Sequence, residues 1–179
     1  GERIGRVLEG GTFLRVGERF GFGMYRAGMA PFPFVFDVRG AGLKHLSLDV
    51  PRGKLVDLDV TFDRDQALVT MTADDAGKRT IAAFWIREDG ALVAHARGDV
   101  DAMSLFDGAP ACMAHGAILV ATERGLVLAR PDARTGEIVE HKVFPETRDA
   151  LAGATSLLPG PGGSVYVASN QEILSLSLA

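Results

Sequence analysis

Two short apolar runs joined by a tight turn occupy residues 118–128, which read Ile118-Leu119-Val120-Ala121-Thr122-Glu123-Arg124-Gly125-Leu126-Val127-Leu128. Each run has the length of a strand and is too short for an ordinary helix. The glycine in the turn lets the backbone reverse with a positive φ angle. The stretch therefore predicts a β-hairpin whose strands are apolar on both faces, as in a sheet that is covered on both sides.

The same order of strand, turn and strand recurs along the chain. An earlier copy begins at Ala67-Leu68-Val69-Thr70-Met71-Thr72 and continues through Ile81-Ala82-Ala83-Phe84-Trp85-Ile86, and a later copy begins at Val165-Tyr166-Val167-Ala168-Ser169. A weaker first copy begins at Gly21-Phe22-Gly23-Met24-Tyr25. Successive copies start roughly 45 to 51 residues apart, close to the ~40–50 residues of a β-propeller blade.

Other segments support an all-β fold. The stretch Leu55-Val56-Asp57-Leu58-Asp59-Val60-Thr61-Phe62 alternates, which predicts a half-buried strand with its carboxylates facing away from the core. Its predicted buried face carries Val56, Leu58, Val60 and Phe62. No window keeps helical spacing for three turns, and 22 Gly and 8 Pro interrupt the chain.

We predict an all-β chain of about four blades, each with four antiparallel strands, forming one β-propeller domain or the C-terminal segment of one over residues 1–179. The blades are expected near residues 10–50, 54–98, 107–145 and 152–179, with a further strand at 3–9. Their first strands are expected near residues 12–17, 55–62, 109–115 and 153–158.

Two arrangements of these blades stay open. Four blades close into a ring if Arg3–Leu8 pairs with Ile173–Leu178. Alternatively, the chain is the last part of a larger propeller, and Arg3–Leu8 is the outer strand of a preceding blade. The first residue is Gly1 rather than Met, and four blades are at the low end for such rings, so we favour the larger propeller.

Composition limits the classes of partner. The 179 residues include 19 Lys and Arg against 23 Asp and Glu, a net charge of -4, which argues against nucleic-acid binding because such binding depends on phosphate neutralisation. No apolar run approaches the ~20 residues of a membrane-spanning helix. The single Cys112 excludes an internal disulfide framework and favours a reducing compartment, so we expect a cytoplasmic protein.

The residue types that can act in catalysis or bind metals show no pattern that indicates a catalytic, metal or cofactor site. The histidines have no metal-ligand spacing, and three of them fall on outer strands of blades. We read Cys112 as a small core residue on an inner strand. Asp63-Arg64-Asp65-Gln66 predicts a hairpin turn, because it lacks the Gly and Glu of a calcium loop. The histidines are His45, His95, His115 and His141.

Charged residues gather in loops that are expected to share one face of the propeller. Asp74-Asp75-Ala76-Gly77-Lys78-Arg79 is interpreted as the loop between the second and third strands of a blade, and Asp99, Asp101, Arg148 and Asp149 fall between blades. The candidate interaction residues are Asp74, Asp75, Lys78, Arg79, Arg148 and Asp149. Pro31-Phe32-Pro33-Phe34 is interpreted as packing between blades, with an exposed partner-binding patch as the alternative.

The blade pattern resembles the WD40, Kelch and quinoprotein-like β-propellers over nearly the whole chain, without their specific signatures: no Gly-His and Trp-Asp pair, no fixed double glycine and no Asp-box. Phe144-Pro145-Glu146-Thr147, with the following Gly153–Leu158 and Val165–Ala168, is similar to uncharacterised bacterial propeller modules of systems with MoxR-type ATPases. That resemblance implies a scaffold role in a larger assembly.

We therefore expect a non-enzymatic scaffold or protein-interaction module. Its partner would be another protein or further blades of the same propeller, with no cofactor. The alternative is a hydrolase or lyase whose polar residues converge at the central channel from several blades.

Overall fold

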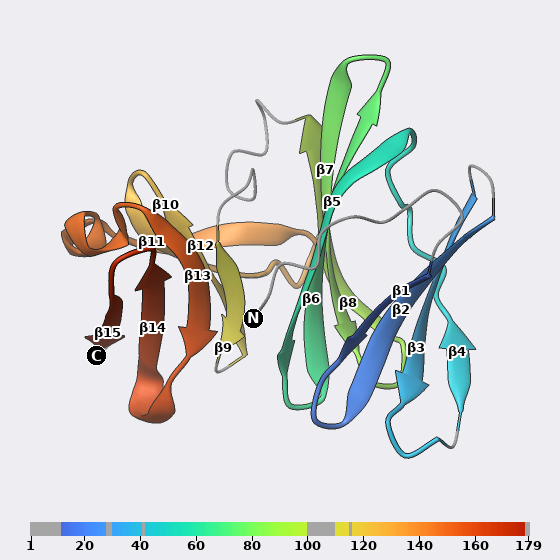
Figure 1. Cartoon of the computed structure of the whole chain (residues 1–179), viewed down its shortest axis with the longest axis horizontal. Coiled ribbons are helices and arrows are strands. Elements are labelled where there is room, and N and C mark those ends of the chain that lie inside the picture. Colours follow the sequence, from blue (N-terminus) through green and yellow to red (C-terminus); the bar gives the residue numbers. More distant parts are fainter. Residues whose placement is uncertain (1–11, 28–29, 41, 100–109, 115, 178–179) are drawn as a thin grey trace.

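The chain folds into four antiparallel β-sheets that follow one another in sequence (Figure 1). The computed structural model describes residues 12–27, 30–40, 42–99, 110–114 and 116–177. Within each sheet the strands pair in chain order, so that every sheet is a meander of neighbouring hairpins. The predicted all-β fold of blade-like sheets is confirmed, and the fourth sheet has three strands where the others have four.

The strands of the first two sheets are three to ten residues long. Sheet 1 consists of β1 (Thr12–Val16), β2 (Phe20–Ala27), β3 (Ala30–Asp37) and β4 (Leu43–His45). Sheet 2 consists of β5 (Lys54–Asp63), β6 (Gln66–Asp75), β7 (Lys78–Arg87) and β8 (Leu92–Asp99).

The last two sheets repeat this pattern. Sheet 3 consists of β9 (Ala111–Ala114), β10 (Ala117–Thr122), β11 (Gly125–Pro131) and β12 (Ile138–Phe144). Sheet 4 consists of β13 (Ala154–Pro159), β14 (Ser164–Ser169) and β15 (Ile173–Ser177). Three single turns of 3-10 helix lie outside the sheets: η1 (Pro145–Thr147), η2 (Asp149–Leu151) and η3 (Pro161–Gly163).

Apolar side chains between neighbouring sheets form three separate layers. Alternate residues of one strand enter different layers: Phe84 of β7 packs toward sheet 1, and Trp85 packs toward sheet 3. Likewise Val120 of β10 packs toward sheet 2, and Leu119 packs toward sheet 4. Each such side chain, when fully buried, stabilises the fold by about 1.5–3 kcal/mol. Sheets 2 and 3 are therefore covered on both faces, as their apolar runs predict.

The sheets are arranged in series along the molecule. The first strand of sheet 3, β9, lies beside the first strands of sheets 2 and 4, β5 and β13. Sheet 1 (blue and cyan) and sheet 4 (red) lie at opposite ends of the long axis (Figure 1). A closed ring of only these four sheets would need sheets 1 and 4 to be neighbours. The predicted pairing of Arg3–Leu8 with Ile173–Leu178 lies outside the described residues.

One detail of the predicted strand at residues 55–62 was wrong. The register of β5 against β6 shifts between Leu55 and Asp57, which marks a β-bulge. A bulge adds one residue to one strand and reverses the face on which the preceding side chain points. Leu55 is consequently buried and Val56 is 53% exposed, whereas Leu58 and Val60 lie in the core as predicted.

The turn between β10 and β11 depends on Gly125. Its φ angle is +114°, and a Cβ atom at this position would lie 2.3 Å from the carbonyl oxygen of Phe144. We expect Gly125→Ala to lower the free energy of unfolding by about 2–3 kcal/mol, because it adds a backbone clash to an unfavourable conformation. Chemical denaturation measures this change.

The matched control is Gly136→Ala in the turn between β11 and β12. Gly136 also has a positive φ angle, +71°, but nothing lies within 4 Å of the place that a Cβ atom would occupy there. This control should cost about 1 kcal/mol. Equal losses of stability in the two variants would contradict the steric explanation.

Candidate interaction surface

The first predicted interaction segment is a hairpin tip rather than a loop. Asp74 and Asp75 end β6, and Lys78 and Arg79 begin β7, so the interpretation of the whole segment as a loop was wrong. Asp75 is opposite Lys78, and Asp74 is opposite Arg79. Opposite charges across an antiparallel pair favour continued pairing. Only residues 76–77 form the turn, both with positive φ angles, which suits a two-residue hairpin.

The second predicted segment, Arg148 and Asp149, belongs to the connection from sheet 3 to sheet 4: Arg148 lies between η1 and η2, and Asp149 is the first residue of η2. Buried Thr147 fixes this connection to sheet 3. Its hydroxyl donates a hydrogen bond to the carbonyl oxygen of Phe144 at 2.7 Å and accepts one from the backbone N–H of Leu126 at 2.8 Å. Arg148 and Asp149 themselves are exposed.

These two segments belong to different parts of the series. The hairpin tip extends from sheet 2, and the Arg148–Asp149 connection leads from sheet 3 to sheet 4 (Figure 1). Asp101, which is predicted to share their face, lies outside the described residues, as does the side chain of Asp99. That the segments act as one binding face stays a prediction.

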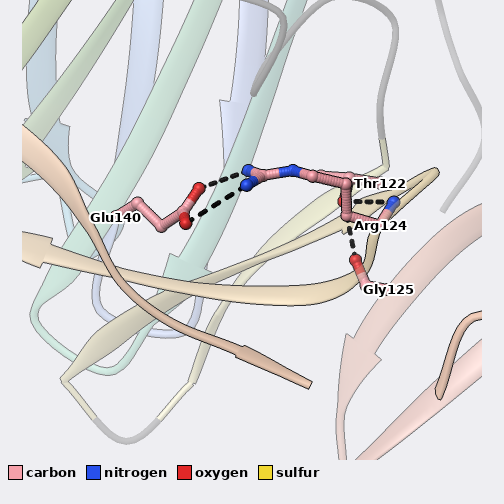
Figure 2. Close-up of polar contacts among 4 residues, drawn as sticks. All are labelled: Thr122, Arg124, Gly125 and Glu140. Carbon is pink, nitrogen blue, oxygen red and sulfur yellow. Dashed lines mark hydrogen bonds and ion pairs between the residues drawn. The ribbon is translucent and has the colours of Figure 1, made fainter. Parts of the chain in front are cut away.

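A further exposed cation lies at the β10–β11 turn, at the corresponding hairpin of sheet 3. Figure 2 shows Arg124 reaching across to the carboxylate of Glu140 on β12 with both of its terminal nitrogens. Thr122 supports the turn, since its hydroxyl donates to the carbonyl oxygen of Gly125 at 2.8 Å and accepts from the backbone N–H of Arg124. The hydrogen bond and charge of Glu140 raise the pKa of Arg124. Sequence reasoning interpreted this segment only as a turn.

The histidines lie where the blade register predicts. His45, His95 and His141 are on β4, β8 and β12, the fourth strand of each of the first three sheets, and all three are exposed. His115 lies outside the described residues. Within the described ranges, no three His, Cys, Asp or Glu side chains gather in a group that could hold a metal ion. No helix in that part of the chain has the length and apolar character needed to cross a membrane.

Cys112 is a core residue, as predicted. It lies on β9, is 1% exposed and packs in the layer between sheets 3 and 4. Burial raises the pKa of the Cys112 thiol to about 12, and the nearby charge of Asp63 adds to this effect. A thiol that stays protonated is a poor nucleophile, so the side chain fills space rather than reacting.

The face of sheet 1 that points away from sheet 2 is the most apolar exposed surface in the described part of the chain, and we call it the aromatic face. The other face of sheet 1 carries the side chains of Phe13, Phe22 and Val35, which lie in the core, and the strand register places the residues of the aromatic face on the reverse side. Phe32 is 45% exposed, Tyr25 47% and Leu14 55%. The aromatic face consists of Thr12, Leu14, Val16, Gly21, Gly23, Tyr25, Phe32, Phe34, Phe36, Leu43 and His45.

Two glycines of β2 determine the shape of the aromatic face. A Cβ atom on Gly21 would lie 2.1 Å from the ring of Phe36, and one on Gly23 would lie 2.3 Å from the ring of Phe34. The two rings therefore lie across β2 where other residues would carry side chains. Phenylalanine over a cross-strand glycine gives a flat apolar surface.

Pro31-Phe32-Pro33-Phe34 has members on both faces of sheet 1. Pro33 is buried opposite Met24 on the core face, as packing between sheets predicts. Phe32 is exposed on the aromatic face of the described structure, so that packing against a further blade and binding of a partner both stay predictions for it. Alternation along β3 sends neighbouring residues to opposite faces. Sequence alone does not show which of the two faces a neighbouring sheet covers.

The face of sheet 4 that points away from sheet 3 is also uncovered by any described sheet, and we call it the serine face. Its apolar members are Leu158, Tyr166 and Ile173, which is 74% exposed. The other members have small side chains. In full, the serine face consists of Ser156, Leu158, Ser164, Tyr166, Ala168, Ile173, Ser175 and Ser177.

The hydrogen bonds of Thr147 predict a measurable loss of stability. Replacing Thr147 with Val keeps the shape but leaves the buried N–H of Leu126 without its acceptor. We expect the free energy of unfolding to fall by about 1–3 kcal/mol in urea denaturation. Thr155→Val is the control, since its hydroxyl bonds to Ala168 at the surface, and it should change stability by less than about 0.5 kcal/mol.

The raised pKa of Cys112 predicts a pH dependence. In the unfolded chain the thiol ionises near its ordinary pKa of 9.0, whereas in the folded protein it stays protonated to about 12. The contribution of the protonated Cys112 thiol to the free energy of unfolding is therefore fully present below about pH 9 and is lost as the pH rises toward 12. Urea denaturation at several alkaline pH values should show a steeper decline for the natural chain than for Cys112→Ala. Parallel declines would contradict the assignment.

Comparisons with known proteins assign no family to this arrangement. No family model matches the chain, and no curated protein matches it. What supports a function is therefore the arrangement of the sheets, their two uncovered faces and the charged turns.

Proposed function

We propose that this chain is a β-propeller module that acts as a scaffold and binds protein by packing an uncovered sheet face against a β-sheet of its partner. The propeller assignment is supported by four meander sheets that pack face to face in series, with the first strands of sheets 2, 3 and 4 side by side. In a propeller, blades of this kind surround an axis that is lined by their first strands.

The observation that carries the binding role is the aromatic face. Strand β3 has apolar side chains on both faces, as do β7 and β10. In β7 and β10 a neighbouring sheet covers each face, whereas in β3 only the face with Val35 is covered within the described structure. Exposed apolar side chains that gather on one sheet face, as Leu14, Tyr25 and Phe32 do here, are typical of a place where another surface binds.

The chemistry of the aromatic face defines the kind of partner. Strand register places no Asp, Glu, Lys or Arg on this face. A flat surface of aromatic and aliphatic side chains matches the side-chain layer of another β-sheet, which packs about 10 Å away without burying a charge. Aromatic side chains are also enriched at the centres of protein interfaces.

The charged turns would contribute at the rim of such a complex. Asp74, Asp75, Lys78, Arg79, Arg148 and Asp149 belong to hairpins and connections at the ends of the sheets, away from the layers between them. Charges in such positions steer association and select partners more than they add affinity. They supplement the aromatic face in this proposal.

The binding role predicts a contact at Phe32 inside the cell. Placing the photo-crosslinking residue p-benzoyl-phenylalanine at position 32 should give, on irradiation of cells that make the protein, a covalent adduct with a polypeptide that mass spectrometry identifies. The same residue at position 92 is the control, because Leu92 on β8 is also 45% exposed. An adduct yield at position 32 no higher than at position 92 would contradict the proposed function.

A further inference from the structure

We infer that the partner of the aromatic face is the serine face of a second copy of this chain, so that two chains stack head to tail into one closed series of eight sheets. This inference rests on the proposed function and names its partner. It follows from the direction of the sheet series, the shapes of the two faces and their lack of charge.

The series has a direction. We call the face of a sheet that points toward the next sheet in the chain its later-facing side, and the opposite face its earlier-facing side. At each of the three internal interfaces, the later-facing side of one sheet packs on the earlier-facing side of the next. Two faces stay uncovered by described sheets: the earlier-facing side of sheet 1, which is the aromatic face, and the later-facing side of sheet 4, which is the serine face. Placing one on the other repeats the packing that the chain already uses three times.

The two faces complement each other in side-chain size. The aromatic face presents large rings, among them Phe32, Phe34 and Phe36. Most of the serine face consists of small side chains, such as Ser156 opposite Ala168 and Ser164 opposite Ser177. Large residues facing small ones let two layers interdigitate at the density of a protein interior. Two aromatic faces together would instead place ring against ring.

Both faces are also free of Asp, Glu, Lys and Arg. Burying the two faces against each other therefore leaves no unpaired charge in the interface, and a buried unpaired charge is strongly unfavourable. Ser175 and Tyr166, neighbours across β14 and β15, have hydroxyl groups that act as both donors and acceptors. They are able to satisfy each other or the few polar atoms of the aromatic face.

Two copies are the expected number, because propellers typically have four to eight blades and two chains together supply eight sheets. A head-to-tail contact that is made twice around a two-fold axis uses all four faces and closes the ring, which stops further growth. The expected species is a dimer, with twice the 19.0 kDa mass of one chain.

Light scattering on the whole chain and three variants tests the inference. The natural chain and the control Leu92→Glu should be dimers. Phe32→Glu on the aromatic face and Ile173→Glu on the serine face should each weaken the dimer at least about 100-fold, because each places a carboxylate in both interfaces. Mixing these two variants should restore a dimer that is weaker than the natural one. One of its two interfaces then joins an intact serine face to an intact aromatic face, and the other holds both carboxylates.

The outcomes separate the possible failures. A dimer that Phe32→Glu dissociates and Ile173→Glu does not would show aromatic face on aromatic face and overturn the head-to-tail contact. A natural chain that stays monomeric at high concentration would overturn the second copy as partner. The crosslink from position 32 then decides the proposed function separately: an adduct with another protein retains it, and no adduct overturns it. Recovery of the dimer on mixing also shows that both variants are folded.

Discussion

Face-to-face packing of sheets that are apolar on both sides is the interaction on which the rest of this structure depends. A strand such as Ile81–Ile86 has no polar face to present to water, so its sheet is stable only between two others. That requirement turns four hairpin meanders into a series rather than four independent units. It also keeps polar groups out of the layers: only Thr72 and Thr147 among the described polar residues are buried.

The same constraint separates two kinds of surface on the molecule. Charged side chains lie outside the layers between sheets, as in the exposed hairpin of Asp74–Arg79 and the exposed pair of Arg124 with Glu140. Uncharged surface is exposed on the two faces that no described sheet covers, one on sheet 1 and one on sheet 4. The loops therefore offer selectivity, while the sheet faces offer the apolar area from which most of the binding free energy of a stable interface comes.

Much of the fold could be predicted from the sequence, because local chemistry determines it. Turn glycines such as Gly125 and two-sided runs such as Ile118–Val120 identify hairpins and buried strands directly. The bulge at Leu55–Asp57 could not be predicted, since the alternation there is compatible with either register until β6 pairs with it. The pairing of Asp75 with Lys78 extends a ladder into residues that composition alone suggests are a loop.

The candidate site was harder to predict than the fold. Phe32 has the same sequence signature whether a sheet covers it or not, because alternation reports which residues share a face and not what lies against that face. Cys112 could be assigned to the core because its neighbours are small and apolar. The exposed Ile173 lies in an alternating segment whose serines resemble an ordinary solvent-facing row, so the interface proposed for this row could not be predicted from the sequence.

The three separate core layers make this chain nearly one-dimensional in its energetics. Stability then resembles a sum of terms for single sheets and for contacts between nearest neighbours, as in repeat proteins. Removing one internal unit of the repeat eliminates its two contacts and brings two new neighbours together in one contact of the same kind. A lineage of such proteins is free to change its number of sheets by whole steps, while substitutions inside a layer have to be compensated by the sheet on the other side.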